Sequence, residues 1–508
     1  MPTNLVPRLA LFLLFVCGAG SALAQPKPDQ PSRETRHEQP ASPNGKGVLR
    51  LLPADSVTEK SVDTAQGKIA YTATAGTLPF YDQSGEQSAA VFYVAYIAKD
   101  RGPNRPLTFV FNGGPGAASA FLNLGAIGPK HVQFGAQGNA PSDSAVARDN
   151  PSSWLDFTDL VFIDPIGTGF SRSLEDEAGT KKDFFTAQAD IEYLSRVIFD
   201  WLNKNGRLTS PHYLIGESYG GYRVPRVAYF LQSRLGVGLN GITMVSPYLN
   251  PSALGAEDNA LSPLPYMISL PSMTAANLER QGKLTGPEAL AEVENYDRTE
   301  YAVDLFRGRS DPQAVERMTA KVSAFTGLDP AIVRRSEGRV EITTYLREIH
   351  RAEGKIGSVY DSNVTAYDPF PGAATQQSND PILDASIAPT TSAAVDLITN
   401  QVGWKVDARY NLLSYEVNRA WTRDNSDSPV TDLRKAIAND PKMQVMIAHG
   451  MDDLSCPYFA SRLIVDQMPS FGVPQRVKLN LYAGGHMFYS RPDSAAQFRR
   501  DAAAMYLR

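Results

Sequence analysis

The sequence predicts an α/β fold in which helices cover a central, mostly parallel sheet. Three observations support this prediction: short unbroken apolar runs, helical stretches between them, and clusters of glycine or polar residues where the runs end. The runs are LTFVFNGG, DLVFIDP, HYLIGES, ITMVSP, MQVMIAHG and VKLNLYAGG. Continuous rather than alternating apolarity indicates strands that are buried on both faces, which is typical of parallel sheets.

Other stretches supply the remaining elements of this architecture. The runs KIAYTATAGTLPF and AVFYVAYIAKD flank the turn-like YDQSGEQ and predict an antiparallel hairpin at a sheet edge. Residues 183–203 predict a covering helix, because Ile191, Leu194, Ile198 and Trp201 recur at steps of three and four.

Between residues 251 and 430 the strand pattern stops. Thr285 to Glu288 (TGPE) offers a capping box with proline in the first turn, and SDPQAVERMTAKVSAFTG offers an N-terminal cap and a terminal Gly327. We therefore expect a helical cap insertion over 251–430, which divides the core into a first part, 49–250, and a second part, 431–508.

Composition limits the kinds of partner. The chain has 508 residues, 43% of them hydrophobic, so it can bury a large core in two or three structural units. It carries 54 acidic and 49 basic residues, and its net charge is −5. No basic field attracts nucleic acid or an anionic membrane, so a nucleic-acid-binding role is disfavoured.

The first 24 residues read as a secretory signal peptide. They contain Arg8, a long apolar run and an Ala22-Leu23-Ala24 cleavage site. Cys17 suggests a lipoprotein instead, but the bulky side chains before it disfavour that processing. Residues 25–48 are rich in proline, glutamine, serine and charge, which predicts a disordered linker.

We therefore expect an exported protein, either periplasmic or extracellular. No later segment has enough consecutive apolar residues for a membrane anchor. Removing the signal leaves a single cysteine, Cys456, so no intramolecular disulfide can form.

A serine lies in a strand-to-helix turn in GESYG. Gly216 and Gly220 flank Ser218 with the G-x-S-x-G spacing, after the HYLI strand and before a helical stretch. This context is typical of a nucleophile elbow, in which the small residues allow a tight turn.

Two later strand ends supply an acid and a base. Asp452 and Asp453 follow the strand in AHGMDDLSCP, and His486 follows the strand in LYAGGHMFY. The order Ser, Asp, His is that of the α/β-hydrolase arrangement, in which imidazole takes the serine proton and the acid orients the imidazole. His449 remains an alternative base, although its place within a strand favours a packing role.

A glycine-rich loop, Asn112 to Gly116 (NGGPG), follows the LTFVF strand. Backbone N–H groups in such a loop can approach the oxyanion of a tetrahedral intermediate, and the residue after the nucleophile can donate a second hydrogen bond.

Taken together, these motifs resemble the serine carboxypeptidases of the α/β-hydrolase fold. The resemblance spans roughly residues 65–250 and 440–490 and rests on FNGGPGAASA, NPSSWLDFTDLVFIDPIGTGFS, GESYGGYRVP, GMDDLSCP and GGHM. It implies a nucleophile, a general base and an orienting acid, which are Ser218, His486 and Asp453, with Asp452 as the alternative acid.

The resemblance also implies how the substrate is held. It places oxyanion donors at the backbone of Gly114 and Tyr219, and recognition of the terminal carboxylate at Asn112, Gly113 and Glu217. Because two ionised carboxylates repel each other, Glu217 can fill this role only with a shared proton and a raised pKa. We therefore expect higher peptidase activity at acidic than at alkaline pH.

Two further positions, outside the triad, can be compared with the family pattern. Family members often carry a glutamate where this chain has Ala126, so the acid expected to share the proton of Glu217 is missing. Cys456 matches a position where some members carry a cysteine near the acid and the pocket, and we expect a buried, inert thiol there.

The sequence thus predicts a serine-type carboxypeptidase that forms an acyl-enzyme, takes peptide or protein C-termini as substrates, and needs no metal or cofactor. An esterase or acyltransferase of the same fold is the first alternative, and a non-catalytic binding protein on a hydrolase scaffold is the second.

Overall fold

The computed structural model describes residues 47–99, 102, 104–132, 141–142, 145–249, 261–373, 380–422, 428–471 and 476–506. The predicted signal peptide and nearly all of the predicted linker lie outside these residues. Within the described part of the chain, no helix combines the length and the apolarity needed to cross a membrane.

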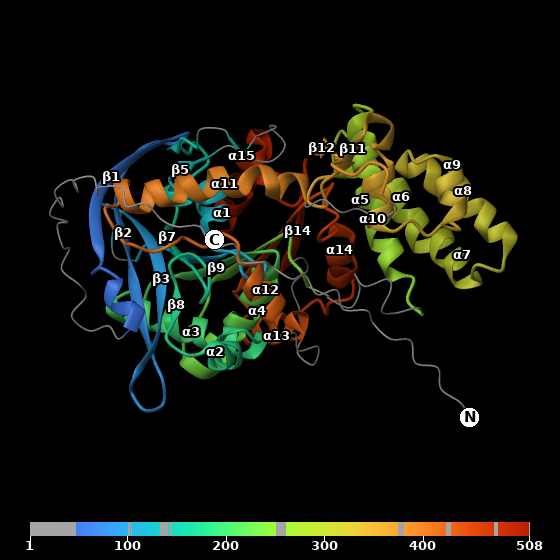
Figure 1. Ribbon diagram of the computed structural model, residues 1–508. Coiled ribbons are helices and arrows are strands. Elements are labelled where there is room, and N and C mark those ends of the chain that lie inside the picture. The colour runs from blue at the N-terminus through green and yellow to red at the C-terminus, as the bar shows by residue number, and fades with distance from the viewer. Residues whose placement is uncertain are drawn as a thin grey trace, which may run out of the picture. The chain divides into compact units, whose positions relative to one another are not determined.

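The centre of the protein is a ten-stranded sheet with the order β1-β2-β3-β7-β4-β9-β10-β13-β14, in which β8 also pairs with β3 (Figure 1). The strands are β1 (Ser56–Thr64), β2 (Gly67–Tyr81), β3 (Gln87–Ala98), β4 (Leu107–Phe111), β7 (Asp159–Ile163), β8 (Arg172–Ser173), β9 (His212–Glu217), β10 (Gly241–Val245), β13 (Gln444–Gly450) and β14 (Val477–Tyr482). Every pair from β7 to β14 is parallel. The six apolar runs form these six parallel strands, so the predicted α/β fold is confirmed.

The predicted hairpin is formed by β2 and β3, which pair antiparallel. It does not lie at the very edge of the sheet, because β1 pairs antiparallel with the outer side of β2 and forms the edge strand. The alternating, largely polar residues of β1 gave no comparable apolar signal.

Helices cover both faces of the sheet. Successive residues of β9 belong to different hydrophobic clusters: Tyr213 and Ile215 join one, and Leu214 joins the other. The core helices are α1 (Ala120–Leu122), α2 (Glu177–Phe184), α3 (Ala187–Lys204), α4 (Tyr219–Phe230), α13 (Pro429–Asn439), α14 (Tyr458–Asp466) and α15 (Pro492–Tyr506). The helix expected over 183–203 is found as α3, after the shorter α2.

A second group of helices follows β10. It comprises α5 (Leu264–Arg280), α6 (Ala291–Tyr296), α7 (Ala302–Arg307), α8 (Pro312–Thr326), α9 (Pro330–Arg335) and α10 (Ile342–Glu348). These helices lie together in one group (Figure 1). They share a hydrophobic cluster of their own, which extends onto α14.

The two sequence signals at helix ends in this group had different outcomes. Asp311 caps α8 through its side chain, and Gly327 ends that helix in the left-handed conformation, as expected. The capping box expected at Thr285 is wrong, because a short 3₁₀ turn begins at Pro287 with Gly286 at its N-cap and no side-chain cap.

The later part of the segment 251–430 packs differently. It contains the small antiparallel pair β11 (Lys355–Gly357) and β12 (Thr365–Tyr367), then α11 (Pro381–Asp396) and α12 (Tyr415–Ala420). Ile382, Ala393 and Trp404 belong to the hydrophobic cluster on one face of the central sheet. Buried residues between Ile382 and Leu412 thus belong to the core on one face of the sheet, whereas α5 to α10 form the separate helical cluster.

Candidate active site

Ser218 lies in the turn between β9 and α4. Its φ of 58° and ψ of −119° place it in a backbone conformation that non-glycine residues rarely adopt. Its N–H donates to the carbonyl of Val245 on the neighbouring strand at 2.9 Å, which ties the turn to the sheet. This is the geometry that exposes a serine hydroxyl above the end of a parallel sheet.

The flanking glycines are required by close backbone contacts. A Cβ on Gly216 would lie 2.1 Å from the carbonyl oxygen of Gly220, and a Cβ on Gly220 would lie 2.7 Å from the carbonyl oxygen of Phe111. Both distances are far shorter than any real contact. The G-x-S-x-G spacing therefore reflects the packing of the turn.

Asp453 and His486 meet at the ends of β13 and β14. Nδ1 of His486 lies 2.8 Å from Oδ2 of Asp453, and the backbone N–H groups of Ser455 and Cys456 donate to the other oxygen at 2.8 and 2.9 Å. Burial alone would lower the pKa of His486, but the adjacent Asp453 carboxylate more than offsets this, so the pKa is raised. Because Nδ1 faces the acid, Nε2 is left for another partner.

The alternative acid and base do not share this arrangement. The basic group nearest to Asp452 is Arg491, whose Nη2 lies 3.8 Å from the carboxylate. Both carboxylate oxygens of Asp452 are buried. Nε2 of His449 lies 2.8 Å from the hydroxyl of Ser461, and burial lowers the pKa of this histidine to about 3. His449 thus packs inside the protein as a neutral group.

Glu217, which directly precedes Ser218 in the sequence, has a buried side chain. The amide of Asn112 donates to Oε2, and the phenol of Tyr489 lies 2.8 and 2.9 Å from the two carboxyl oxygens. Burial raises the pKa of Glu217 to about 7, although these hydrogen bonds and His486 act in the opposite direction. Near neutral pH this carboxyl can therefore gain or lose a proton.

The glycine-rich loop lies against the elbow. A Cβ on Gly113 would lie 2.5 Å from the backbone nitrogen of Tyr219, so only glycine permits this approach. Gly114 follows with a φ of 100°, a region that favours glycine. Gly114 and Tyr219 line one pocket with Ser218.

The pocket has a volume of about 230 Å³ and contains both Ser218 and His486. The pocket is also lined by Asn112, Gly113, Gly114, Glu217 and Tyr219. All the predicted site residues except Asp453 therefore line this one pocket. Asp453 lies behind it and contacts His486. The remaining wall is mainly apolar and aromatic, formed by Phe121, Tyr248, Tyr360, Leu383, Leu413 and Met487.

Cys456 also lines the pocket, in agreement with its motif position. Burial, followed by the charge of Asp453, raises the pKa of this thiol well above its ordinary value. A thiol held in its protonated form is a poor nucleophile, as expected for an inert cysteine.

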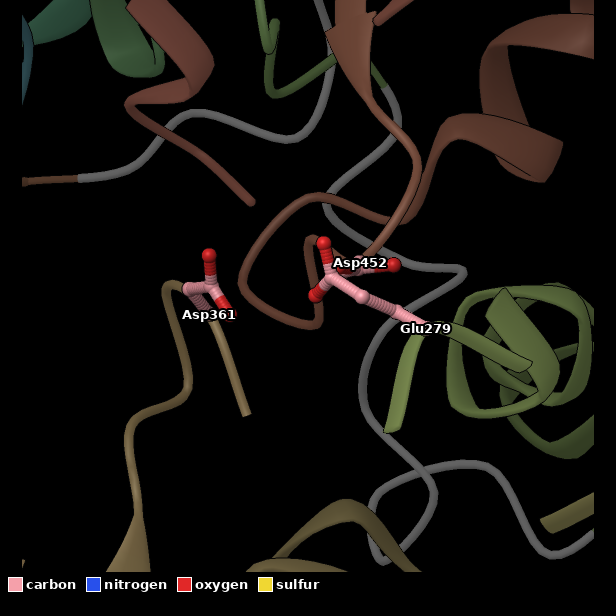
Figure 2. A group of neighbouring side chains, drawn as sticks. All are labelled: Glu279, Asp361 and Asp452. Carbon is pink, nitrogen blue, oxygen red and sulfur yellow. The ribbon is translucent and has the colours of Figure 1, made fainter. Parts of the chain in front are cut away.

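A separate group of carboxylates could in principle hold a metal ion. Glu279 at the end of α5, Asp361 and Asp452 bring carboxylate oxygens within 4.8 Å of one another (Figure 2). However, Nη2 of Arg491 lies 2.7 Å from Asp361, 3.2 Å from Glu279 and 3.8 Å from Asp452. A guanidinium nitrogen thus already lies among these oxygens, in the position that a cation would take.

Sequence reasoning missed Tyr489 and the pocket wall from the segment 251–430. Tyr489 lies three residues after His486, but nothing in its sequence context indicates a contact with Glu217. Tyr360, Leu383 and Leu413 are ordinary apolar or aromatic residues in a segment where no motif marks them. Only the folded arrangement brings them to the site.

The comparisons with known proteins agree with the motifs. The sequence model of the serine carboxypeptidase family matches residues 68–306. Among curated proteins, serine carboxypeptidase S10 family member 1 of Dictyostelium discoideum is 28% identical over 187 residues, which are 35% of this chain and 42% of that protein. Serine carboxypeptidase-like 36 of Arabidopsis thaliana is 29% identical over 221 residues, 42% of this chain and 40% of that protein. The match thus spans about two fifths of these relatives' length.

The fold has a counterpart among solved structures. The chain resembles Kex1Δp, a prohormone-processing carboxypeptidase of Saccharomyces cerevisiae, with a TM-score of 0.56 and 15% sequence identity, over 86% of this chain and 91% of that one. At this identity the likeness concerns the fold, which is that of the α/β hydrolases.

Proposed function

We propose that this chain, which belongs to the serine carboxypeptidase family, is a serine-type carboxypeptidase that removes C-terminal residues from peptides through an acyl-enzyme. The observation that carries the proposal is the shared pocket of Ser218, His486 and Glu217. It combines a nucleophile and a base with a carboxyl group whose pKa, raised to about 7 by burial, suits the binding of a substrate carboxylate.

In the first half-reaction, Oγ of Ser218 attacks the carbonyl carbon of the last peptide bond while Nε2 of His486 takes the hydroxyl proton. Asp453 keeps the imidazole in the correct tautomer and stabilises its positive charge. The N–H groups of Gly114 and Tyr219 donate to the developing oxyanion.

The tetrahedral intermediate then collapses. His486 returns the proton to the nitrogen of the leaving amino acid, the C–N bond breaks, and the acyl group remains on Ser218. Water, deprotonated by His486, attacks the acyl carbon. The bond from this carbon to Oγ of Ser218 then breaks, His486 returns the proton to Oγ, and the shortened peptide leaves.

Glu217 provides the preference for a free C-terminus. In its protonated form it donates a hydrogen bond to the substrate carboxylate, together with the amide of Asn112 and the N–H of Gly113. An ionised Glu217 would repel that carboxylate in a buried site. The proton on Glu217 is therefore part of substrate recognition.

The test compares two N-blocked dipeptides that differ only in a free or amidated C-terminus, with the wild type and with Ser218→Ala, over about pH 5 to 8. We expect release of the terminal residue mainly from the free form, and none with Ser218→Ala. A matched ester substrate distinguishes the esterase alternative. Equal turnover of both dipeptides, or turnover of the ester alone, would contradict the carboxypeptidase proposal.

We also propose that the protein is exported with cleavage after Ala24, as its N-terminal sequence predicts. Cell fractionation with N-terminal sequencing of the mature chain tests this. An N-terminus at Gln25 in the exported fraction is expected, and an uncleaved cytoplasmic protein would contradict it.

A further inference from the structure

Tyr489 lies behind Glu217 and not in the pocket itself. It belongs to the short 3₁₀ turn η10 (Phe488–Ser490) that follows His486, and only 1% of its surface is exposed. Its hydroxyl lies 2.8 Å from Oε1 and 2.9 Å from Oε2 of Glu217, so its one proton can serve either oxygen. Glu217 lines the pocket and Tyr489 does not. Tyr489 can therefore act on a substrate through Glu217.

The hydrogen bond from Tyr489 favours the charged form of Glu217. A donor stabilises an ionised carboxylate and so lowers its pKa, which opposes the effect of burial. The other groups that face Glu217 are the amide of Asn112 and the charge of His486, which lower the pKa, and Asp453, which raises it.

Tyr489 itself remains a donor at every working pH. Burial, and then the neighbouring Glu217, raise the pKa of its phenol well above the ordinary value. A second carboxyl beside Glu217 would act in the opposite way, because a neighbouring negative charge raises the pKa of a carboxyl group. The position where the family resemblance implies such an acid is Ala126, and the turn that contains it, η2 (Asn123–Ile127), packs against η10.

We propose that Tyr489 is a positioning residue that sets the highest pH at which Glu217 can bind a substrate carboxylate. The proposal rests on the function proposed above. In the binding step, ionised Glu217, one proton and the substrate carboxylate combine, and the proton is retained between the two carboxyl groups. The Tyr489 hydroxyl stabilises ionised Glu217 and so opposes the uptake of this proton. Removal of the hydroxyl should therefore extend substrate binding to higher pH.

The experiment measures binding without turnover. Ser218→Ala serves as the background, and the dissociation constants of the free and amidated N-blocked dipeptides are determined by calorimetry from about pH 5 to 9. Above the Glu217 transition, binding of the free dipeptide should weaken about tenfold per pH unit, because one proton is taken up. Tyr489→Phe removes the donor and keeps the ring.

Tyr489→Phe should move this transition upward by roughly one pH unit, since a hydrogen bond to a charged group contributes an effect of about that size. The variant should then bind the free dipeptide like its parent in acid and about tenfold more tightly on the alkaline side. A loss of packing alone would weaken binding at all pH values. With Glu217→Gln as the background, Tyr489→Phe should cause no shift.

The matched control is Tyr482→Phe, which removes another phenol-to-carboxylate hydrogen bond, at 2.8 Å to Asp501, without contact to Glu217. It should leave the transition unmoved. If Tyr489→Phe does not fold, Tyr489→Met removes the same donor with a side chain that adapts to irregular space.

The outcomes separate the two proposals. If the parent prefers the free dipeptide but the transition does not move in the Tyr489 variants, the role of Tyr489 is overturned and the carboxypeptidase proposal stands. If the parent binds both dipeptides equally at every pH, carboxylate recognition by Glu217 fails, and the role of Tyr489 fails with it.

Discussion

His486 presents Nδ1 to Asp453 at 2.8 Å, while Asp452, the neighbour of that acid in the chain, lies 3.8 Å from Arg491. The two adjacent aspartates thus have different surroundings. Asp453 contacts the predicted base, whereas Asp452 belongs to the cluster of three carboxylates in Figure 2. This separation makes the acid of the triad testable by two isosteric substitutions.

Asp453→Asn should reduce kcat by about 10³- to 10⁴-fold, because an amide cannot hold the imidazole in the required tautomer or stabilise its charge. Asp452→Asn should keep kcat within a few fold of the wild type, and it serves as the matched control. Peptidase assays on both variants, with circular dichroism to verify folding, provide the measurement. A large loss of kcat in Asp452→Asn alone would reverse the assignment.

The pH dependence of substrate preference should follow Glu217. Its pKa is raised to about 7 by burial, so the protonated form that binds a carboxylate predominates below that pH and is lost above it. The ratio of kcat/KM between free and amidated dipeptides should therefore be constant in acid and fall above about pH 7. Protonation of His486 changes kcat/KM for both substrates by the same factor, so its effect cancels in this ratio. A constant ratio up to about pH 9 would contradict the role of Glu217.

Stability should also depend on pH through Asp452. Burial, followed by the charges of Asp361 and Glu279, raises the pKa of Asp452 well above its ordinary value. An acid with a raised folded-state pKa contributes stability that is complete below its unfolded pKa and is lost as the pH rises through the folded value. The free energy of unfolding should therefore decline toward alkaline pH.

Asp452→Asn should flatten this decline, because an amide is neutral at every pH and can donate to Glu279. Urea unfolding at about pH 6 and about pH 9 measures the difference for the wild type and the variant. An unchanged slope in Asp452→Asn would mean that another group causes the decline.

A buried ion pair supports the loop beside the elbow. Nε of Arg223 lies 2.6 Å from Asp190, both side chains are almost fully buried, and Nη1 of Arg223 donates to the carbonyl of Asn112 at 2.7 Å. Arg223→Met leaves Asp190 buried without its partner, which should cost about 3–5 kcal/mol of unfolding free energy.

The double variant Arg223→Met/Asp190→Leu should recover part of that loss, because no uncompensated charge remains. Lys181→Met, which breaks the exposed pair with Glu177, is the matched control and should stay close to the wild type. Urea unfolding measures all three variants. A loss in Arg223→Met no larger than in Lys181→Met would show that the ion pair has little effect.

The sheet could be predicted because buried parallel strands leave continuous apolar runs, and each of the six runs forms one strand. The antiparallel edge was predicted incompletely, since β1 has mostly polar residues and pairs through its backbone. α11 falls within the segment 251–430 that is expected as the cap, because the absence of a strand pattern does not distinguish the helices of a cap from a helix that packs on the sheet. Its packing on the sheet depends on tertiary contacts.

The candidate site could be predicted where the local sequence around a residue reflects its role. Ser218 requires glycines around it, and Asp453 and His486 follow strands that end at the same edge of the sheet. Tyr489 could not be predicted, because its contact with Glu217 depends on how the chain turns after His486. The same holds for Leu383 and Leu413, which reach the pocket only through the packing of the segment that contains them.

The order in which the site residues occur along the chain has a consequence for biosynthesis. The elbow with Ser218 is made before β13 and β14, whereas Asp453 and His486 lie on either side of β14. A chain interrupted anywhere before that strand carries the serine without its base. The proposed hydrolysis therefore requires that synthesis has passed β14 and His486, so chains that stop earlier could not attack the peptides around them.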